Sequence, residues 1–186
     1  ASSRFHKELA DVPWYGLSEQ WRMPRLIRRH RLDLIHFPHF NVPILTPIPF
    51  VVTVHDLILL HHPTTSGTTL PPWLYRVKFR AYRLVLLHAL RRSKSILTVS
   101  QWTKRDLMRT YPFLNESDIV VAHEANSALQ KDSVDPNKAR QTVQKYGILK
   151  PYLLYVGNAY PHKNLSRLLE AFLALERSDV VLVCVG

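Results

Sequence analysis

YLLYVGNAYPHKNLSRLLEAFLAL, residues 152–175, is the stretch that indicates the fold most directly. Tyr152 to Val156 is an apolar run with the length and composition of a strand, and Gly157 ends it. After a polar loop over residues 158–162, apolar residues recur at helical spacing, at Leu165, Leu168, Leu169, Phe172 and Leu175. A strand, a glycine turn and a helix in this order place backbone N–H groups and the positive end of a helix at the carboxyl edge of a sheet, where a phosphate can bind.

Lys163 lies where this helix is expected to begin. Its compact ammonium group would meet a phosphate oxygen at the mouth of the helix. The same residues also fit an ordinary strand–helix unit with an exposed lysine, because a glycine and a lysine at this spacing form only a short motif. The remaining sequence is needed to distinguish a phosphate site from an ordinary strand–helix unit.

Strands and helices are predicted to alternate along the rest of the chain, on both sides of a polar segment. The predicted strands are continuous apolar runs, at residues 34–37, 50–54, 96–99, 119–122 and 180–185. The predicted helices cover residues 24–31, with Pro24 in the first turn, and residues 73–92, 102–110 and 138–146. Residues 57–72 are expected to form a loop. Continuous apolar strands that alternate with helices favour parallel sheets covered by helices.

The chain therefore has the pattern of an α/β protein with two Rossmann-like, doubly wound domains. We expect residues 1–125 to be the end of a first domain, residues 126–137 a polar linker, and residues 138–186 the start of a second domain. The chain opens on Ala1 and stops at Gly186, directly after an apolar run, so we expect both domains to be incomplete. A cleft between two such domains, at the carboxyl ends of the strands, is a usual ligand site.

The amino-acid composition indicates which kinds of binding partner and which cellular compartment to expect. The 25 lysines and arginines against 14 acidic residues give a formal charge of +11, which attracts phosphorylated molecules, anionic lipid or nucleic acid. Cys184 is the single cysteine, so there is no disulfide framework, and a reducing, cytoplasmic location is expected. No apolar run approaches the length of a membrane span.

Several polar residues follow predicted strands and are candidates for chemistry. His55 comes directly after residues 50–54, and its imidazole can hydrogen-bond a sugar hydroxyl or simply a loop carbonyl. Ser100 lacks the flanking glycines of a nucleophile elbow and is expected to cap a helix, facing the cleft. Histidines cluster at positions 36, 39, 55, 61 and 62, but they form no His-Glu-x-x-His helix and lack a second well-placed carboxylate beside Asp56. We therefore expect no metal site.

Arg76, Arg80 and Arg83 share one face of the long predicted helix. The simplest interpretation is a solvated helix face. The functional alternative is peripheral contact with an anionic membrane surface, such as the inner face of the membrane, where each cation contributes about 1 kcal/mol. Nucleic-acid binding would need aromatic residues among the charges on an exposed sheet, and no such array is present.

Five segments in order carry a resemblance to a known family. These are LDLIHFPHFNVP, PFVVTVHDLILLHHP, SILTVSQWTKRDL, YLLYVGNAYPHKNLSRLLEAF and VLVCVG. Over residues 30–186 the chain resembles the GT-B glycosyltransferases of family 4, which are retaining enzymes that use nucleotide-sugar donors. The resemblance depends on the order and spacing of the segments, since no single motif is decisive.

The resemblance implies a role for particular residues. His55, in TVHDL, matches the family histidine that reaches the donor sugar, and Ser100 matches a serine that faces the cleft at a helix start. Gly157 matches the glycine that opens the donor-phosphate loop, and Lys163, in PHKN, matches the lysine that contacts the donor diphosphate. Asn158 stands where many members have arginine, which removes one cation from the diphosphate site.

The resemblance also implies a function. We expect transfer of a sugar, by subgroup resemblance mannose, with retention to a glycan or lipid-linked acceptor in polysaccharide biosynthesis, with no cofactor and no metal. The family's glycine-rich loop would precede Ala1 and its paired glutamates would follow Gly186, so we expect this chain alone to be inactive. The alternatives are a non-catalytic remnant that binds a nucleotide sugar or a partner, a different GT-B activity, and a basic nucleic-acid-binding module.

Overall fold

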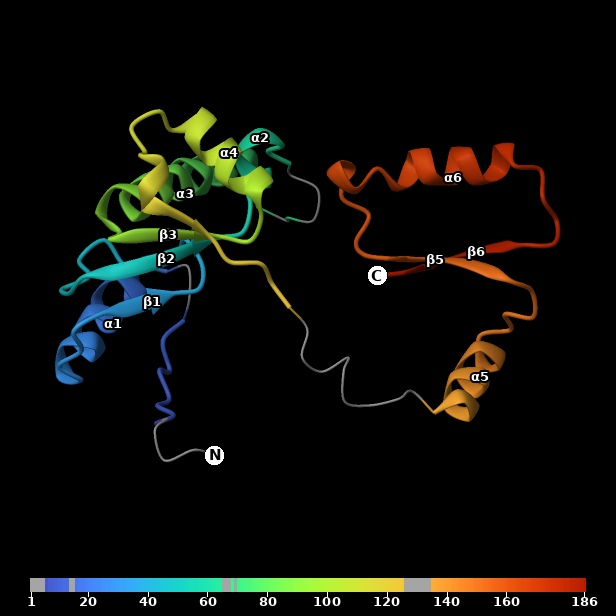
Figure 1. Cartoon of the computed structure of the whole chain (residues 1–186), viewed down its shortest axis with the longest axis horizontal. Coiled ribbons are helices and arrows are strands. Elements are labelled where there is room, and N and C mark those ends of the chain that lie inside the picture. The colour runs from blue at the N-terminus through green and yellow to red at the C-terminus, as the bar shows by residue number, and fades with distance from the viewer. Residues whose placement is uncertain (1–5, 14–15, 65–67, 69, 126–134) are drawn as a thin grey trace. The chain divides into compact units, whose positions relative to one another are not determined.

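A computed structural model of the chain describes residues 6–13, 16–64, 68, 70–125 and 135–186. The chain divides into two compact units. The first unit takes in Ala1–Thr65 and Thr69–Glu124, and the second takes in Ser66–Thr68 and Ala125–Gly186. The strands of both units are parallel and alternate with helices, so the predicted α/β class is confirmed (Figure 1).

The first unit is built on a four-stranded parallel sheet in the order β1-β2-β3-β4. Its strands are β1 (Ile35–Phe37), β2 (Phe50–Val54), β3 (Ser95–Thr98) and β4 (Ile119–Val121). Pairing sets Phe37 beside Val52, and Val54 beside Thr98, so the carboxyl ends of neighbouring strands meet at one edge. The expected strands lie within a residue or two of the observed ones, because each is a short β-branched or apolar run bounded by polar residues.

Helices cover both faces of this sheet. The helices α3 (Pro72–Arg92) and α4 (Gln101–Thr110) lie on one face, and α1 (Leu17–Arg29) lies on the other (Figure 1). The core between them consists of the buried apolar residues Ile27, Phe37, Val42, Phe50, Val52, Val54, Leu57, Leu86, Ala89, Leu90, Ile96, Leu107 and Ile119. Along β2 and β3 the buried side chains alternate with half-buried ones, so one face of the sheet carries the core and the other face is only partly covered.

Two helices differ from the expectation. Helix α1 begins at Leu17, so Pro24 lies inside the helix rather than in its first turn, and the prediction of a helix over residues 24–31 was wrong at its start. Proline cannot donate the intrahelical hydrogen bond, but Pro24 and Ile27 are the buried residues of α1, and their packing offsets that loss. The expected loop over residues 57–72 contains a short helix, α2 (Ile58–His61), which is too short to show a period in the sequence.

The second unit contains a two-stranded parallel sheet of β5 (Tyr152–Val156) and β6 (Val181–Val185). Between these strands come the 3₁₀ turn η3 (Pro161–Lys163) and α6 (Leu165–Ala174), and α5 (Pro136–Lys145) precedes them. The expected linker over residues 126–137 lies largely outside the described residues, and its end forms the start of α5, where Asp135 caps the helix. None of the described helices is long and apolar enough to cross a membrane.

Candidate functional site

The carboxyl edge of the four-stranded sheet gathers polar residues from every strand. Pro38 and His39 follow β1, His55 follows β2, Ser100 follows β3, and His123 with Glu124 follows β4. Parallel pairing in the order β1-β2-β3-β4 brings these strand ends together, which is why residues far apart in the sequence become neighbours. This edge is the candidate site of the first unit.

The imidazole of His55 lies between two acceptors. Its Nε2 donates to the carbonyl of Pro38 over 2.9 Å, and its Nδ1 lies 3.0 Å from Oε1 of Glu124. A carbonyl and a carboxylate only accept hydrogen bonds, so the ring is held between two acceptors. The His55 side chain is 41% exposed and that of Glu124 68% exposed, so the pair holds the ring in place while the site stays open to solvent.

Ser100 is joined to the backbone of His55 through Thr103. The Ser100 hydroxyl accepts from the backbone N–H of Thr103 over 3.1 Å, which confirms the predicted cap of α4. The buried Thr103 hydroxyl donates to the His55 carbonyl over 3.0 Å and lies 3.0 Å from the Ser100 hydroxyl. The end of β2 and the start of α4 are thereby held in one network.

The clustered histidines do not converge on one point. His36 bonds the Thr53 hydroxyl over 2.8 Å, and His61 pairs with Asp106, while the ring centroids of His39 and His55 lie 6.4 Å apart. Burial, and next the neighbouring His55, lower the pKa of His39. Among the described residues no group of three or more His, Cys, Asp or Glu side chains is arranged to hold a metal ion.

In the second unit, Gly157 directly follows β5 and has φ +151°, a backbone conformation that L side chains rarely adopt. Its N–H donates to the carbonyl of Val185 over 2.8 Å, so this amide is used in pairing with β6. The carbonyl of Asn158 accepts from the hydroxyl of Tyr155 over 2.8 Å, which fixes the start of the loop. The N–H of Gly157 is therefore already bonded within the sheet, and what the glycine adds to the loop is its conformation.

Lys163 ends the η3 turn, and Asn164 stands between it and α6 in the left-handed conformation, with φ +54°. The Asn164 side chain makes no capping hydrogen bond to α6, in contrast to the capped start of α4. Within the described residues, the side chain of Lys163 has no ion-pair partner and is exposed. An uncapped helix start beside a cation presents N–H groups and positive charge to solvent, which is the arrangement that binds phosphate.

A family comparison covers most of the first unit. The model of Glycosyltransferase Family 4 matches residues 4–125, which is more than half of the chain. This chain belongs to glycosyltransferase family 4. The predicted membership is confirmed, and with it the GT-B type of Rossmann-like fold.

Two curated relatives of this family 4 chain are O-antigen chain mannosyltransferases. RfbU of Salmonella typhimurium is 26% identical over 84% of the chain, and O-antigen chain mannosyltransferase B of Escherichia coli is 25% identical over 85%. The chain spans 37% and 39% of their lengths. Anabaena Alr3699/HepE, solved in complex with UDP-glucose, is similar in structure, with a TM-score of 0.62 at 16% identity over 92% of this chain and 45% of that protein. That likeness shows the fold.

The structure adds neighbours that sequence reasoning missed. Thr103 and Glu124 contact His55 from α4 and from the end of β4, and His123 bonds the carbonyl of Val99 over 3.1 Å. The available signal was position, since His123 and Glu124 follow a predicted strand just as His55 and Ser100 do. The structure links His55 with Ser100 in the first unit, and it places Gly157, Asn158 and Lys163 on one loop of the second unit.

Proposed function

We propose that the chain forms part of a glycosyltransferase that moves a sugar from a nucleotide-sugar donor to a glycan or lipid-linked acceptor, with retention. Family membership supports this class of reaction. The observation that carries the proposal is the exposed Lys163 beside the uncapped start of α6, at the carboxyl end of β5. The relatives named as mannosyltransferases favour a mannosyl donor, and the complex of Alr3699/HepE with UDP-glucose favours a nucleoside diphosphate as the carrier.

The reaction separates charge, because the anomeric carbon becomes cationic while the nucleoside diphosphate leaves as an anion. In our proposal the ammonium of Lys163 and the N–H groups at the start of α6 stabilise the leaving diphosphate, so the mechanism needs neither a cofactor nor a metal ion. Gly157 shapes the loop for close approach of the diphosphate. Asn158 contributes a polar side chain where many family members place a cation.

His55 holds the donor sugar in this proposal. Its ring is fixed by Pro38 and Glu124, and the exposed contact with Glu124 is the one that a sugar hydroxyl would replace. Ser100 faces the same edge, and its hydroxyl is shared with the cap of α4.

Substitution of Lys163 tests the proposal. In the natural full-length polypeptide, Lys163→Ala should lower the turnover of UDP- or GDP-sugar with acceptor by about a hundredfold or more, because the loss of one electrostatic donor costs about 2.7–4 kcal/mol in the barrier. Lys138→Ala on α5 removes the same charge from an exposed helix and should leave turnover unchanged. Equal rates for Lys163→Ala and the unaltered protein would exclude this role.

A non-catalytic nucleotide-sugar binder is the alternative that calorimetry separates. Titration of UDP and GDP into the full-length polypeptide should give micromolar binding that weakens in Lys163→Ala. Binding of this strength without any release of nucleoside diphosphate in the presence of donor and acceptor would favour the binder over the enzyme.

We also propose that α3 makes peripheral contact with an anionic membrane on its inner, cytoplasmic face. Arg76, Arg80 and Arg83 are exposed, and α3 contains no acidic residue, while Trp73 and Leu84 are 66% and 64% exposed.

Replacing the three arginines of α3 by alanine should release the protein from vesicles that contain anionic lipid. Replacing Arg25, Arg28 and Arg29 of α1 removes the same charge from the other face of the sheet and should not. Equal release by both variants would contradict contact through α3.

A further inference from the structure

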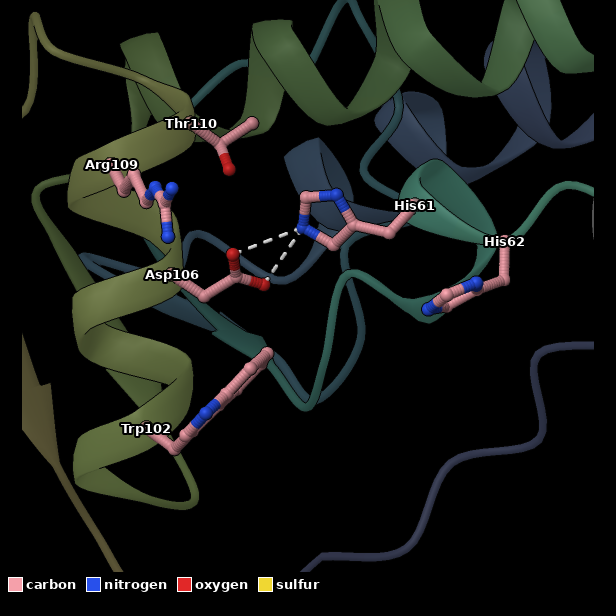
Figure 2. Close-up of a pocket in the computed structure, with 6 residues that line it drawn as sticks. All are labelled: His61, His62, Trp102, Asp106, Arg109 and Thr110. Atoms are coloured by element: carbon pink, nitrogen blue, oxygen red, sulfur yellow. Dashed lines mark hydrogen bonds and ion pairs between the residues drawn. The ribbon is translucent and has the colours of Figure 1, made fainter. Parts of the chain in front are cut away.

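A pocket lies in the first unit, between α2 and α4, and the proposed donor residues do not line it. Its volume is about 480 Å³, within the range of small-molecule sites. Its walls are His61, His62, Trp102, Asp106, Arg109 and Thr110 (Figure 2).

Local structure sets both walls. Asp56 accepts from the N–H of Ile58 over 2.9 Å and so starts α2, which delivers His61 and His62 at its end. On α4 the lining residues are spaced by four, three and one positions, which puts Trp102, Asp106, Arg109 and Thr110 on one face of the helix. Trp102 follows the cap Ser100 by two positions, so the pocket begins beside the candidate edge and runs along α4.

His61 and Asp106 join the two walls. Nε2 of His61 lies 3.0 and 2.9 Å from the two carboxylate oxygens of Asp106, as Figure 2 shows. The Asp106 side chain is only 10% exposed and that of His61 38% exposed, so the carboxylate is held in place from one side and keeps lone pairs for further donors. The guanidinium of Arg109 lies on the same side of the pocket and adds donors (Figure 2).

The indole of Trp102 is 62% exposed and forms a flat apolar wall at the other end of the pocket (Figure 2). A flat ring of this kind packs well against the C–H face of a pyranose. The pocket therefore combines one aromatic surface with a carboxylate acceptor and imidazole and guanidinium donors. Sugar hydroxyls both donate and accept, so a saccharide matches this mixture.

We propose that this pocket binds a saccharide unit of the acceptor. A saccharide fits better than a phosphate or nucleotide, because the carboxylate of Asp106 offsets the charge of Arg109 and would repel an anion. The assignment to the acceptor rests on the proposed glycosyl transfer and on the adjacency of Trp102 to Ser100. Saccharide binding itself rests only on the lining of the pocket.

Chemical-shift mapping of the ¹⁵N-labelled protein tests the site with three probes: mannobiose, lactose and N,N′-diacetylchitobiose. At millimolar concentration at least one disaccharide should shift the Trp102 indole signal and the backbone signals of residues 61–62 and 102–110. Trp102→Ala should weaken that binding by about tenfold. Trp21→Ala removes a comparably exposed tryptophan from α1, at 58% exposure, and should leave the binding unchanged.

Asp106→Asn gives a second variant that keeps the shape of the pocket and should also weaken the binding. Melting temperatures near that of the unaltered protein confirm that the variants are folded. Failure of all three disaccharides to shift these signals, or equal affinity in Trp102→Ala and Trp21→Ala, would overturn the proposal. Titration of the full-length polypeptide with UDP separates this site from the donor site. If UDP binds but no disaccharide does, the pocket proposal alone is refuted. If a disaccharide binds but the full-length polypeptide releases no nucleoside diphosphate from a donor, the proposed glycosyl transfer alone is refuted.

Discussion

At the scale of single residues, the contacts of His55 are the clearest information that the structure adds to the sequence. The imidazole touches Pro38 with one nitrogen and Glu124 with the other, and the backbone carbonyl is held by Thr103. Its position directly after β2 was predictable from the apolar run before it. The contact with Thr103 joins positions 48 apart, and both it and the Glu124 contact depend on strand order, which no local pattern encodes.

Two substitutions separate the role of His55 from that of its partner. In the full-length polypeptide, His55→Ala should lower turnover by about a hundredfold, because it removes the proposed hydrogen bond to the donor sugar in the transition state. Glu124→Gln should change turnover by less than about fivefold, since an exposed ion pair contributes about 0–1 kcal/mol. Initial rates at saturating donor measure both. A loss in Glu124→Gln as large as that in His55→Ala would show that the pair, rather than the imidazole alone, is needed.

At the scale of elements, apolar runs and caps predict most of the first unit. Both β2 and α4 are found where the sequence indicates, because each has a local cause: a β-branched run for β2 and the Ser100 cap for α4. Helix α1 has no comparable start signal, since Gly16 precedes it without a side-chain cap and Pro24 lies within it. The pocket between α2 and α4 was not predicted either. Helix α2 is only four residues long, which is too short to show a helical period in the sequence.

The cap of α4 predicts a measurable stability change. Ser100→Ala removes the acceptor for the Thr103 N–H and should lower the free energy of unfolding by about 1 kcal/mol in urea titrations. Ser100→Asp should retain most of the stability, because a carboxylate also caps. If Ser100→Ala leaves stability unchanged but lowers turnover, the hydroxyl acts on the substrate rather than on the helix.

The packing of α3 on the sheet predicts a pH dependence. His88 stacks on Phe50 with ring centroids 6.5 Å apart, and burial together with Arg92 lowers its pKa below the ordinary value of 6.5. Its buried Nε2 has no hydrogen-bond partner among the described residues. Below a pH of about 6.5 the unfolded chain binds a proton that folded His88 does not, so the free energy of unfolding should fall as the pH drops.

His88→Phe keeps the aromatic contact with Phe50 and removes the titrating group. Urea titrations at several pH values should show a shallower loss of stability in acid for this variant than for the unaltered protein. His39, whose pKa is also lowered, accounts for part of the slope that remains. An identical slope in both proteins would mean that His88 is protonated equally in the folded and unfolded states.

At the scale of the whole molecule, the two units differ in how much they bury. Every buried apolar residue of the described chain belongs to the first unit. In the second unit the strands carry exposed apolar side chains, among them Leu154 at 56% and Val156 at 72% exposure, and no residue of α5 or α6 is buried. Since burial supplies most of the stability of a fold, the first unit should be much the more stable one.

Hydrogen exchange of the 186-residue chain tests this difference. Amides of β2 and β3, which are paired on both sides, should exchange at least about a hundredfold more slowly than those of β5 and β6, a difference of about 2.7 kcal/mol in opening free energy. Comparable protection in both sheets would contradict the assignment of the core to the first unit. Added UDP should slow exchange in the loop from Gly157 to Lys163 and at the start of α6, because a ligand that binds only the ordered loop stabilises it. Slower exchange confined to the first unit would instead place the nucleotide at the edge that holds His55.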